Sequence, residues 1–226
     1  MKQSLQSKEH GTHPGILAVA ERLFAEIGFE KTTVADIARE LRMSPANVYR
    51  FFSAKAEINE AVGRRLLRAV EAAGEEIVRQ PQPAGEKLRA FLAAVENAND
   101  DRFRSNRKLH DLLETAFSQN WPIAHDHIEK ITKLLCEIIS QGDRDGEFAV
   151  DDCELAAILV RSASMRFWHP RLIVECAEDP EPTLDQMVDF CLAALAAPKL
   201  DAREGAHPLR PNGTLPLKAP KLCEPE

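Results

Sequence analysis

The chain has 226 residues, of which 44% are hydrophobic and 29% charged, and its formal net charge is −7. This length suits one large or two small domains, and the hydrophobic content is sufficient for a packed core. The five cysteines are odd in number, widely spaced and without a Cys-x-x-Cys pair, which argues against a disulfide framework and a zinc knuckle.

The apolar residues are not distributed as in a membrane or secreted protein. No run of eighteen apolar residues occurs, and residues 1–30 lack the apolar core of a signal peptide. We therefore expect a cytoplasmic protein without a membrane partner.

The charge is unevenly divided along the chain. Residues 1–65 hold 10 Lys and Arg against 8 Asp and Glu, whereas the remaining residues hold 19 against 28. A slightly basic head on an acidic body suits a protein that presents one end to phosphate, although ordinary variation in surface charge gives the same small excess.

The N-terminal residues divide into a polar segment and a helix. Residues 1–13 are polar and are expected to form a flexible arm. The helix that follows has an apolar stripe and is stopped by Gly28. Its stripe consists of Ile16, Ala20, Leu23, Phe24 and Ile27.

Residues 32–52 predict two short helices joined by a tight turn. Val34, Ile37, Ala38 and Leu41 have the i, i+3, i+4, i+7 spacing of one buried helix face. Thr33 and Asp36 form a capping-box pattern that starts this first helix. Ser44 and Pro45 then supply an N-cap and a first helical residue for the second. Two such helices make a helix-turn-helix, whose second helix is sized to enter a DNA major groove.

These residues carry a family resemblance. The ungapped stretch AERLFAEIGFEKTTVADIARELRMSPANVYRFFSAKAEI resembles the N-terminal DNA-binding domain of the TetR family of bacterial transcription regulators. The resemblance covers about residues 14–65 and includes the Thr-Thr-Val, Ile-Ala and Ser-Pro-x-x-x-Tyr points. One departure is Arg42, which stands where the family usually has the glycine of the turn. A non-glycine residue held at positive φ there costs about 1 kcal/mol.

The rest of the chain also has the period of helices. A long helix is expected from Ile58 to Ile77, ended by Pro81 and Pro83. Further helices are predicted over residues 88–97, 109–117, 123–139, 152–168, 172–176 and 183–197, with residues 142–146 as a loop. The predicted fold is therefore all-α, with a three-helix helix-turn-helix domain at 14–65 and a helical effector-binding and dimerisation domain at 66–198. Residues 199–226 hold several prolines and are expected to be a disordered tail.

Eight residues are expected to contact DNA. Asn47 suits adenine and Arg50 suits guanine through paired hydrogen bonds. Pro45 and Ala46 suit a thymine methyl, and Ser44 lies beside them at the start of the helix. Thr33 lies at a helix N-terminus, which favours phosphate. The remaining two, Tyr49 and Lys55, match family positions that commonly touch the DNA backbone.

The resemblance also implies a homodimer and a ligand. Dimerisation would use the last two long helices, at about 152–168 and 183–197, and would allow two recognition helices to read a palindromic operator. The resemblance places an effector pocket among aromatic residues of the middle helices, for a small apolar or aromatic molecule. The aromatic residues expected to line this pocket are Phe91, Phe117, Trp121, Phe167 and Trp168. Each of them could instead simply fill the core.

Metal and enzyme chemistry are disfavoured. His110, His125, Asp126 and His127 contain metal-ligating types, but residues two apart on a helix point to different faces. The chain has no Gly-rich phosphate loop and no nucleophile motif, so we expect neither a cofactor nor catalysis.

The sequence thus predicts a DNA-binding transcription regulator, a homodimeric repressor released from its operator by an effector and located in the bacterial cytoplasm at the nucleoid. Two alternatives stay open. One is a DNA-bound protein that recruits a protein partner without a small ligand, and the other is a transcriptional activator.

Overall fold

The computed structural model of the protein describes residues 2–179 and 181–196, with side chains from His13 onward. These residues form helices and contain no strand, so the predicted all-α class is confirmed. The helices are α1 (Lys2–Ile27), α2 (Val34–Glu40), α3 (Pro45–Tyr49), α4 (Lys55–Arg79), α5 (Ala84–Ser105), α6 (Arg107–Ser118), α7 (Pro122–Asp145), α8 (Cys153–Ala163), α9 (Met165–Trp168), α10 (Pro170–Glu175) and α11 (Leu184–Ala196). The predicted tail at 199–226 lies outside the described residues.

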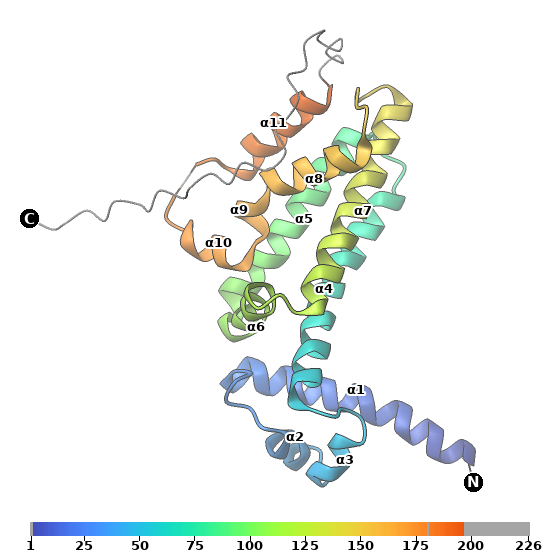
Figure 1. Cartoon of the computed structure of the whole chain (residues 1–226), viewed down its shortest axis with the longest axis vertical. Helices are drawn as coiled ribbons and strands as arrows, with labels where there is room; N and C mark the ends of the chain where they lie inside the picture. The colour runs from blue at the N-terminus through green and yellow to red at the C-terminus, as the bar shows by residue number, and fades with distance from the viewer. Residues whose placement is uncertain (1, 180, 197–226) are drawn as a thin grey trace, which may run out of the picture.

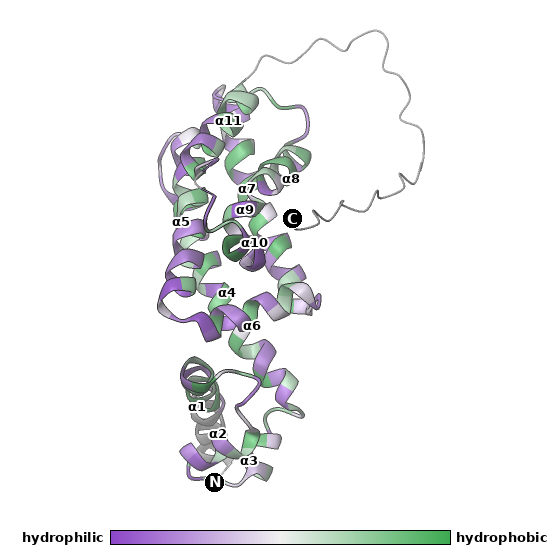
Figure 2. Ribbon diagram, turned by 90° about the vertical axis from the view of Figure 1, so that its left-hand side faces the viewer, coloured by the Kyte–Doolittle hydropathy of each residue, from purple (hydrophilic) through white to green (hydrophobic). Residues whose placement is uncertain are grey.

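The molecule has two tiers along its long axis. Helices α1, α2 and α3 form a small domain at one end, and α4 rises from it into a larger bundle that contains α5, α7, α8 and α11 (Figure 1). Figure 2 shows the same arrangement from the side, with α11 at the end opposite α3. The helix-turn-helix therefore lies far from the last helix of the chain.

The small domain has its own apolar core. Ile16 and Phe24 of α1, Ile37 of α2 and Val48 of α3 are fully buried in it. The predicted stripe of α1 is correct except at Ile27, which is 42% exposed because α1 ends there and Gly28 turns the chain away at φ 94°.

The first helix is longer than the sequence predicted. Residues 2–13, assigned above to a flexible arm, continue α1 to Lys2. Residues added to an existing helix need no new nucleation, and this segment contains good helix formers such as Gln, Lys and Glu, although Pro14 within α1 has no N–H to donate.

Two predicted boundaries in the large domain are wrong. Residues 142–146 were expected to be a loop, but α7 continues to Asp145 and ends at Gly146. The ring of Phe148 folds back onto Gly142 and occupies the place where a Cβ would lie, so this glycine serves packing rather than a turn. The helix expected at 152–168 is broken at Ser164, where the buried hydroxyl donates to the carbonyl of Val160 and α9 starts in a new direction.

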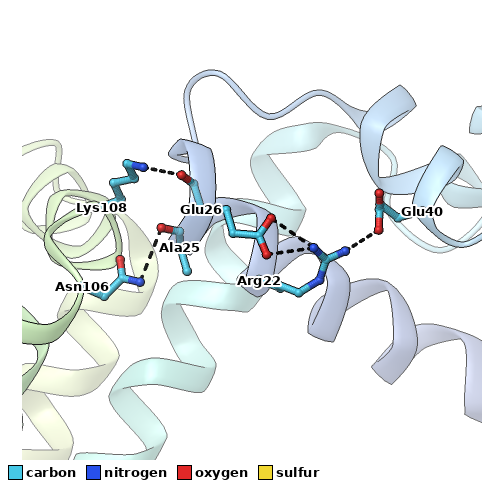
Figure 3. A network of polar contacts seen from close by, with 6 residues as sticks. All are labelled: Arg22, Ala25, Glu26, Glu40, Asn106 and Lys108. Atoms are coloured by element: carbon cyan, nitrogen blue, oxygen red, sulfur yellow. Dashed lines mark hydrogen bonds and ion pairs between the residues drawn. The ribbon is translucent and has the colours of Figure 1, made fainter.

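A second contact joins the two tiers besides α4. The side chains of Asn106 and Lys108, at the start of α6, donate to the carbonyls of Ala25 and Glu26 at the end of α1 (Figure 3). In the same network Arg22 pairs with Glu26 and Glu40. Leu109 and Leu112 of α6 also join the core of the small domain, so the tiers are attached at two points.

The turn of the helix-turn-helix adopts the strained conformation that its sequence predicted. Arg42 has φ 53°, in the left-handed region that favours glycine. The N–H of Met43 donates to Ala38 and that of Arg42 to Arg39, which is the hydrogen-bond pattern of a Schellman motif. The motif ends α2 and turns the chain toward α3.

This strain makes a stability prediction. Replacing Arg42 by glycine is expected to raise the free energy of unfolding by about 1 kcal/mol, since glycine adopts positive φ without a steric cost. Urea unfolding of the purified chain measures the change. Arg39→Gly, in the last turn of α2, is the control and is expected to lower the free energy of unfolding by about 1 kcal/mol. An Arg42→Gly protein less stable than the unmodified chain would contradict the prediction.

Candidate functional site

Helix α3 presents a polar surface at the free end of the molecule. Val48 is fully buried against α2, and the nearby Phe52 is buried as well, which fixes the rotation of the short helix. The side chains on its other faces point to solvent. All six of the residues predicted here to contact DNA are exposed, namely Ser44, Pro45, Ala46, Asn47, Tyr49 and Arg50. This is the geometry of a recognition helix.

Thr33 and Asp36 form the predicted capping box. The Thr33 backbone N–H and hydroxyl donate to the Asp36 carboxylate at 2.9 and 2.7 Å, and the Asp36 N–H donates to the Thr33 hydroxyl oxygen at 3.1 Å. The hydrogen bonds from Thr33, together with Arg39, hold the pKa of Asp36 at about 2. Both donors of Thr33 are therefore engaged, so a phosphate would have to compete with Asp36 for them.

Lys55 lies in the first turn of α4 and is half-buried. Its ammonium group donates to the carbonyl of Glu30 at 3.0 Å, and burial lowers the pKa of Lys55. Lys55 thus ties the loop after α1 to the start of α4. The sequence pattern gave no sign of this contact, because it joins residues 25 positions apart.

A cavity of about 60 Å³ lies in the large domain. Leu67 of α4 is on one side of it, and α5, α6, α7, α8, α9 and the start of α10 supply the rest of the wall. Two of the predicted pocket residues, Phe117 and Trp168, line it. A third, Phe91, is fully buried and contacts the Trp168 ring edge-on at 6.4 Å.

The other two predicted pocket residues lie elsewhere. Trp121 is at the junction of α6 and α7, where its indole N–H donates to Gln119 at 3.1 Å. Phe167 lines a separate, more polar groove beside Glu96 and Arg166. Position along the helices did not distinguish these two aromatic side chains from those that reach the cavity.

The cavity wall contacts α4 through a polar bond as well as through Leu67. His127 of α7, which lines the cavity, bonds through Nδ1 to the Glu71 carboxylate of α4 at 2.8 Å. The neighbouring pairs Arg64–Asp126 and Glu75–Lys130 join the same two helices. The cavity wall is therefore bonded to the helix that enters the small domain.

The histidines considered above as metal ligands have other surroundings. His125 is exposed, and His110 is buried, with its Nε2 2.9 Å from the Pro170 carbonyl oxygen. Burial lowers the pKa of His110, which favours the neutral ring. Within residues 13–179 and 181–196 no three His, Cys, Asp or Glu side chains are grouped to hold a metal ion.

Large apolar side chains are exposed on α8 and α11. Leu155, Ile158 and Leu159 of α8 are exposed, the last at 60%, and Phe190 of α11 is 68% exposed. In the part of the chain that the structure describes, no helix is long and apolar enough to cross a bilayer. Both of these helices lie near the end of the described chain.

The fold and the exposed recognition helix define a helix-turn-helix DNA-binding protein, and comparison with known proteins agrees. The model described as "Bacterial regulatory proteins, tetR family" matches residues 16–62. The model described as "Tetracyclin repressor-like, C-terminal domain" matches residues 84–188. Together they cover more than half of the chain.

Individual proteins are similar to this chain over most of their length. The transcriptional repressor KstR2 of Mycobacterium tuberculosis is 26% identical over 160 residues, which are 69% of this chain and 80% of the repressor. The TetR-family regulator PfmR of Thermus thermophilus is 26% identical with a TM-score of 0.51, over 80% of this chain and 96% of its own. A TetR/AcrR-family regulator of Thermobifida fusca superposes with a TM-score of 0.59 at 20% identity, over 84% and 100% of the two chains.

The chain belongs to the TetR family of bacterial transcription regulators. It is accordingly a DNA-binding regulator and not an enzyme.

Proposed function

We propose that this regulator is a homodimeric repressor that binds a palindromic operator in the bacterial cytoplasm and leaves it when a small effector binds in the large domain. The observation that carries the proposal is the exposed polar face of α3, held rigidly at the free end of the molecule by Val48 and Phe52. The similarity to a repressor, KstR2, favours repression over activation.

The residues at the start of α3 contact the bases. Asn47 pairs with adenine and Arg50 with guanine, each through two hydrogen bonds in the major groove. Pro45 and Ala46 contact thymine methyl groups, and Ser44 bonds a base edge or phosphate, since its side chain makes no cap bond to α3. Thr33, Tyr49 and Lys55 position the domain on the DNA backbone.

Dimerisation uses the exposed apolar faces of α8 and α11. A lone recognition helix reads only a few base pairs, so specific binding needs a second copy. Leu155, Leu159 and Phe190 would be buried between two copies, and the exposed Ala193 and Ala194 allow close helix contact.

Effector release acts through α4. The cavity lies against Leu67, and His127 in its wall bonds to Glu71, so a ligand that enlarges the cavity displaces α4 and the small domain with it. One observation favours the alternative protein that recruits a partner without a ligand. The cavity of about 60 Å³ is smaller than the roughly 300 Å³ of ordinary ligand pockets.

The first test is selection of bound sites from random duplex DNA with the purified chain and with Asn47→Ala. The chain is expected to enrich a palindrome, and Asn47→Ala is expected to lose preference at one adenine in each half-site, worth about 1–3 kcal/mol. Selection of no consensus at low salt would refute sequence-specific binding. A consensus unchanged by Asn47→Ala would refute the assigned role of Asn47.

Two further variants separate base reading from phosphate contact. Arg50→Ala is expected to relax preference at one position of each half-site, again by about 1–3 kcal/mol. Lys55→Ala is expected to weaken binding to all sequences alike and to reduce the salt dependence by about one phosphate contact for each subunit. Titrations of the selected site and a scrambled site at several salt concentrations measure both effects, and thermal unfolding controls for the lost Lys55–Glu30 bond. If both variants change affinity without changing preference, the assignment of Arg50 is wrong.

The proposed dimer makes a separate prediction. Leu159→Glu places a charge in the apolar face of α8 and is expected to raise the dimer dissociation constant by about thirty-fold or more. Analytical ultracentrifugation measures the change, and binding to the full palindrome should weaken in parallel. Ala73→Glu, at an exposed position of α4, is the matched control. Equal sedimentation of the two variants as dimers would exclude this face as the interface.

A further inference from the structure

Two nitrogen atoms at the cavity are buried without a partner. Arg161 Nε on α8 and Trp168 Nε1 on α9 have no hydrogen-bond acceptor among the described residues, and both side chains line the same cavity. Trp168 is only 9% exposed. A buried donor without an acceptor is costly, so two of them at one cavity call for an acceptor that the described residues do not supply.

The Arg161 guanidinium places a positive charge at the cavity. Arg161 forms no ion pair with a described carboxylate, and a guanidinium stays charged at neutral pH. The Glu71 carboxylate of α4 is bonded to His127, a residue of the cavity wall. Asn99 is also satisfied, since it donates to the Trp168 carbonyl and accepts from Arg102. The unmatched group is thus a cation, and its natural partner is an anion.

Most of the remaining wall residues are apolar, although Asn99, His127 and His169 also line the cavity. Leu67, Val95, Leu113, Phe117 and Ile131 surround the space away from the two donors. A ligand that suits both parts has an anionic end and an apolar body. Arginine binds carboxylates through planar, charge-assisted hydrogen bonds, and the indole N–H can donate a further hydrogen bond to the same carboxylate.

We propose that the cavity binds a small monocarboxylic acid, whose carboxylate accepts hydrogen bonds from Arg161 and the Trp168 indole N–H and whose hydrocarbon part lies against Leu67 and Phe117. The proposal rests on the proposed effector function and specifies its ligand class. It narrows the apolar or aromatic molecule expected from the sequence to an acid.

The cavity size adds a constraint on this acid. A cavity of about 150 Å³ holds one benzene molecule, so the present 60 Å³ accommodates only part of such a ligand. Binding must therefore move the wall outward. Leu67 lies on α4, so an acid seated on Arg161 displaces the helix that leads to the DNA-binding domain.

The test measures binding of defined probes to the full chain without DNA. Butyrate and benzoate are titrated at pH 7 by calorimetry, with 1-butanol and benzyl alcohol as neutral probes of similar size. At least one acid is expected to bind with a dissociation constant of about 1 mM or lower. Its alcohol is expected to bind at least about ten-fold more weakly, because a charged hydrogen-bond pair is lost.

Substitutions then locate the carboxylate. Arg161→Met keeps an unbranched side chain without donors and is expected to weaken acid binding by about ten- to hundred-fold, with little effect on the alcohols. Arg161→Lys retains the charge and should recover part of the affinity. Trp168→Phe should weaken acid binding by up to about ten-fold. The control is Arg104→Met, which removes an exposed guanidinium on α5 that is paired with Asp100.

Three results would overturn the proposal. They are no binding of either acid, equal binding of acids and alcohols, and acid binding unchanged in Arg161→Met. Because these titrations contain no DNA, they fail independently of operator binding. Acid binding together with no selected DNA site would support the ligand class and refute the proposed repressor function.

Discussion

The burial of α4 in two cores is the constraint on which the rest of the structure depends. Ile58 and Val62 pack in the core of the small domain, whereas Val70 packs in that of the large domain. A continuous helix transmits rotation and displacement along its axis, because each turn is bonded to the next. The small domain and the cavity wall therefore share one helix, although they lie in different tiers of the molecule.

The attachment through α6 gives the small domain a second point of contact with the large domain. With α4 alone, the small domain could pivot about the point where the helix emerges. Leu109 and Leu112 pack into the small domain, and Asn106 and Lys108 bond to the end of α1, so a pivot must break a second set of contacts. Phe117, on the same α6, lines the cavity. Both α4 and α6 thus contribute residues to the cavity wall.

The sequence predicted features that depend on residues close together in the chain. The capping box at Thr33 follows from a local pattern and the positive φ of Arg42 from the family resemblance, and the structure has both. Prediction from the sequence failed where contacts between distant residues determine the local structure. Glycine and three charged residues at 142–146 suggested a loop, because nothing local indicates that the Phe148 ring packs on Gly142. The unpaired donors of Arg161 and Trp168 were likewise unpredictable, since a missing partner appears only when every neighbour is placed.

The bonds between α6 and α1 have a consequence for how this sequence can change. Their acceptors are the backbone carbonyls of Ala25 and Glu26, which any amino acid at those positions would provide. Their donors are the side chains of Asn106 and Lys108, which few other residues can replace. These two bonds therefore depend on the side chains at positions 106 and 108 but only on the backbone at positions 25 and 26.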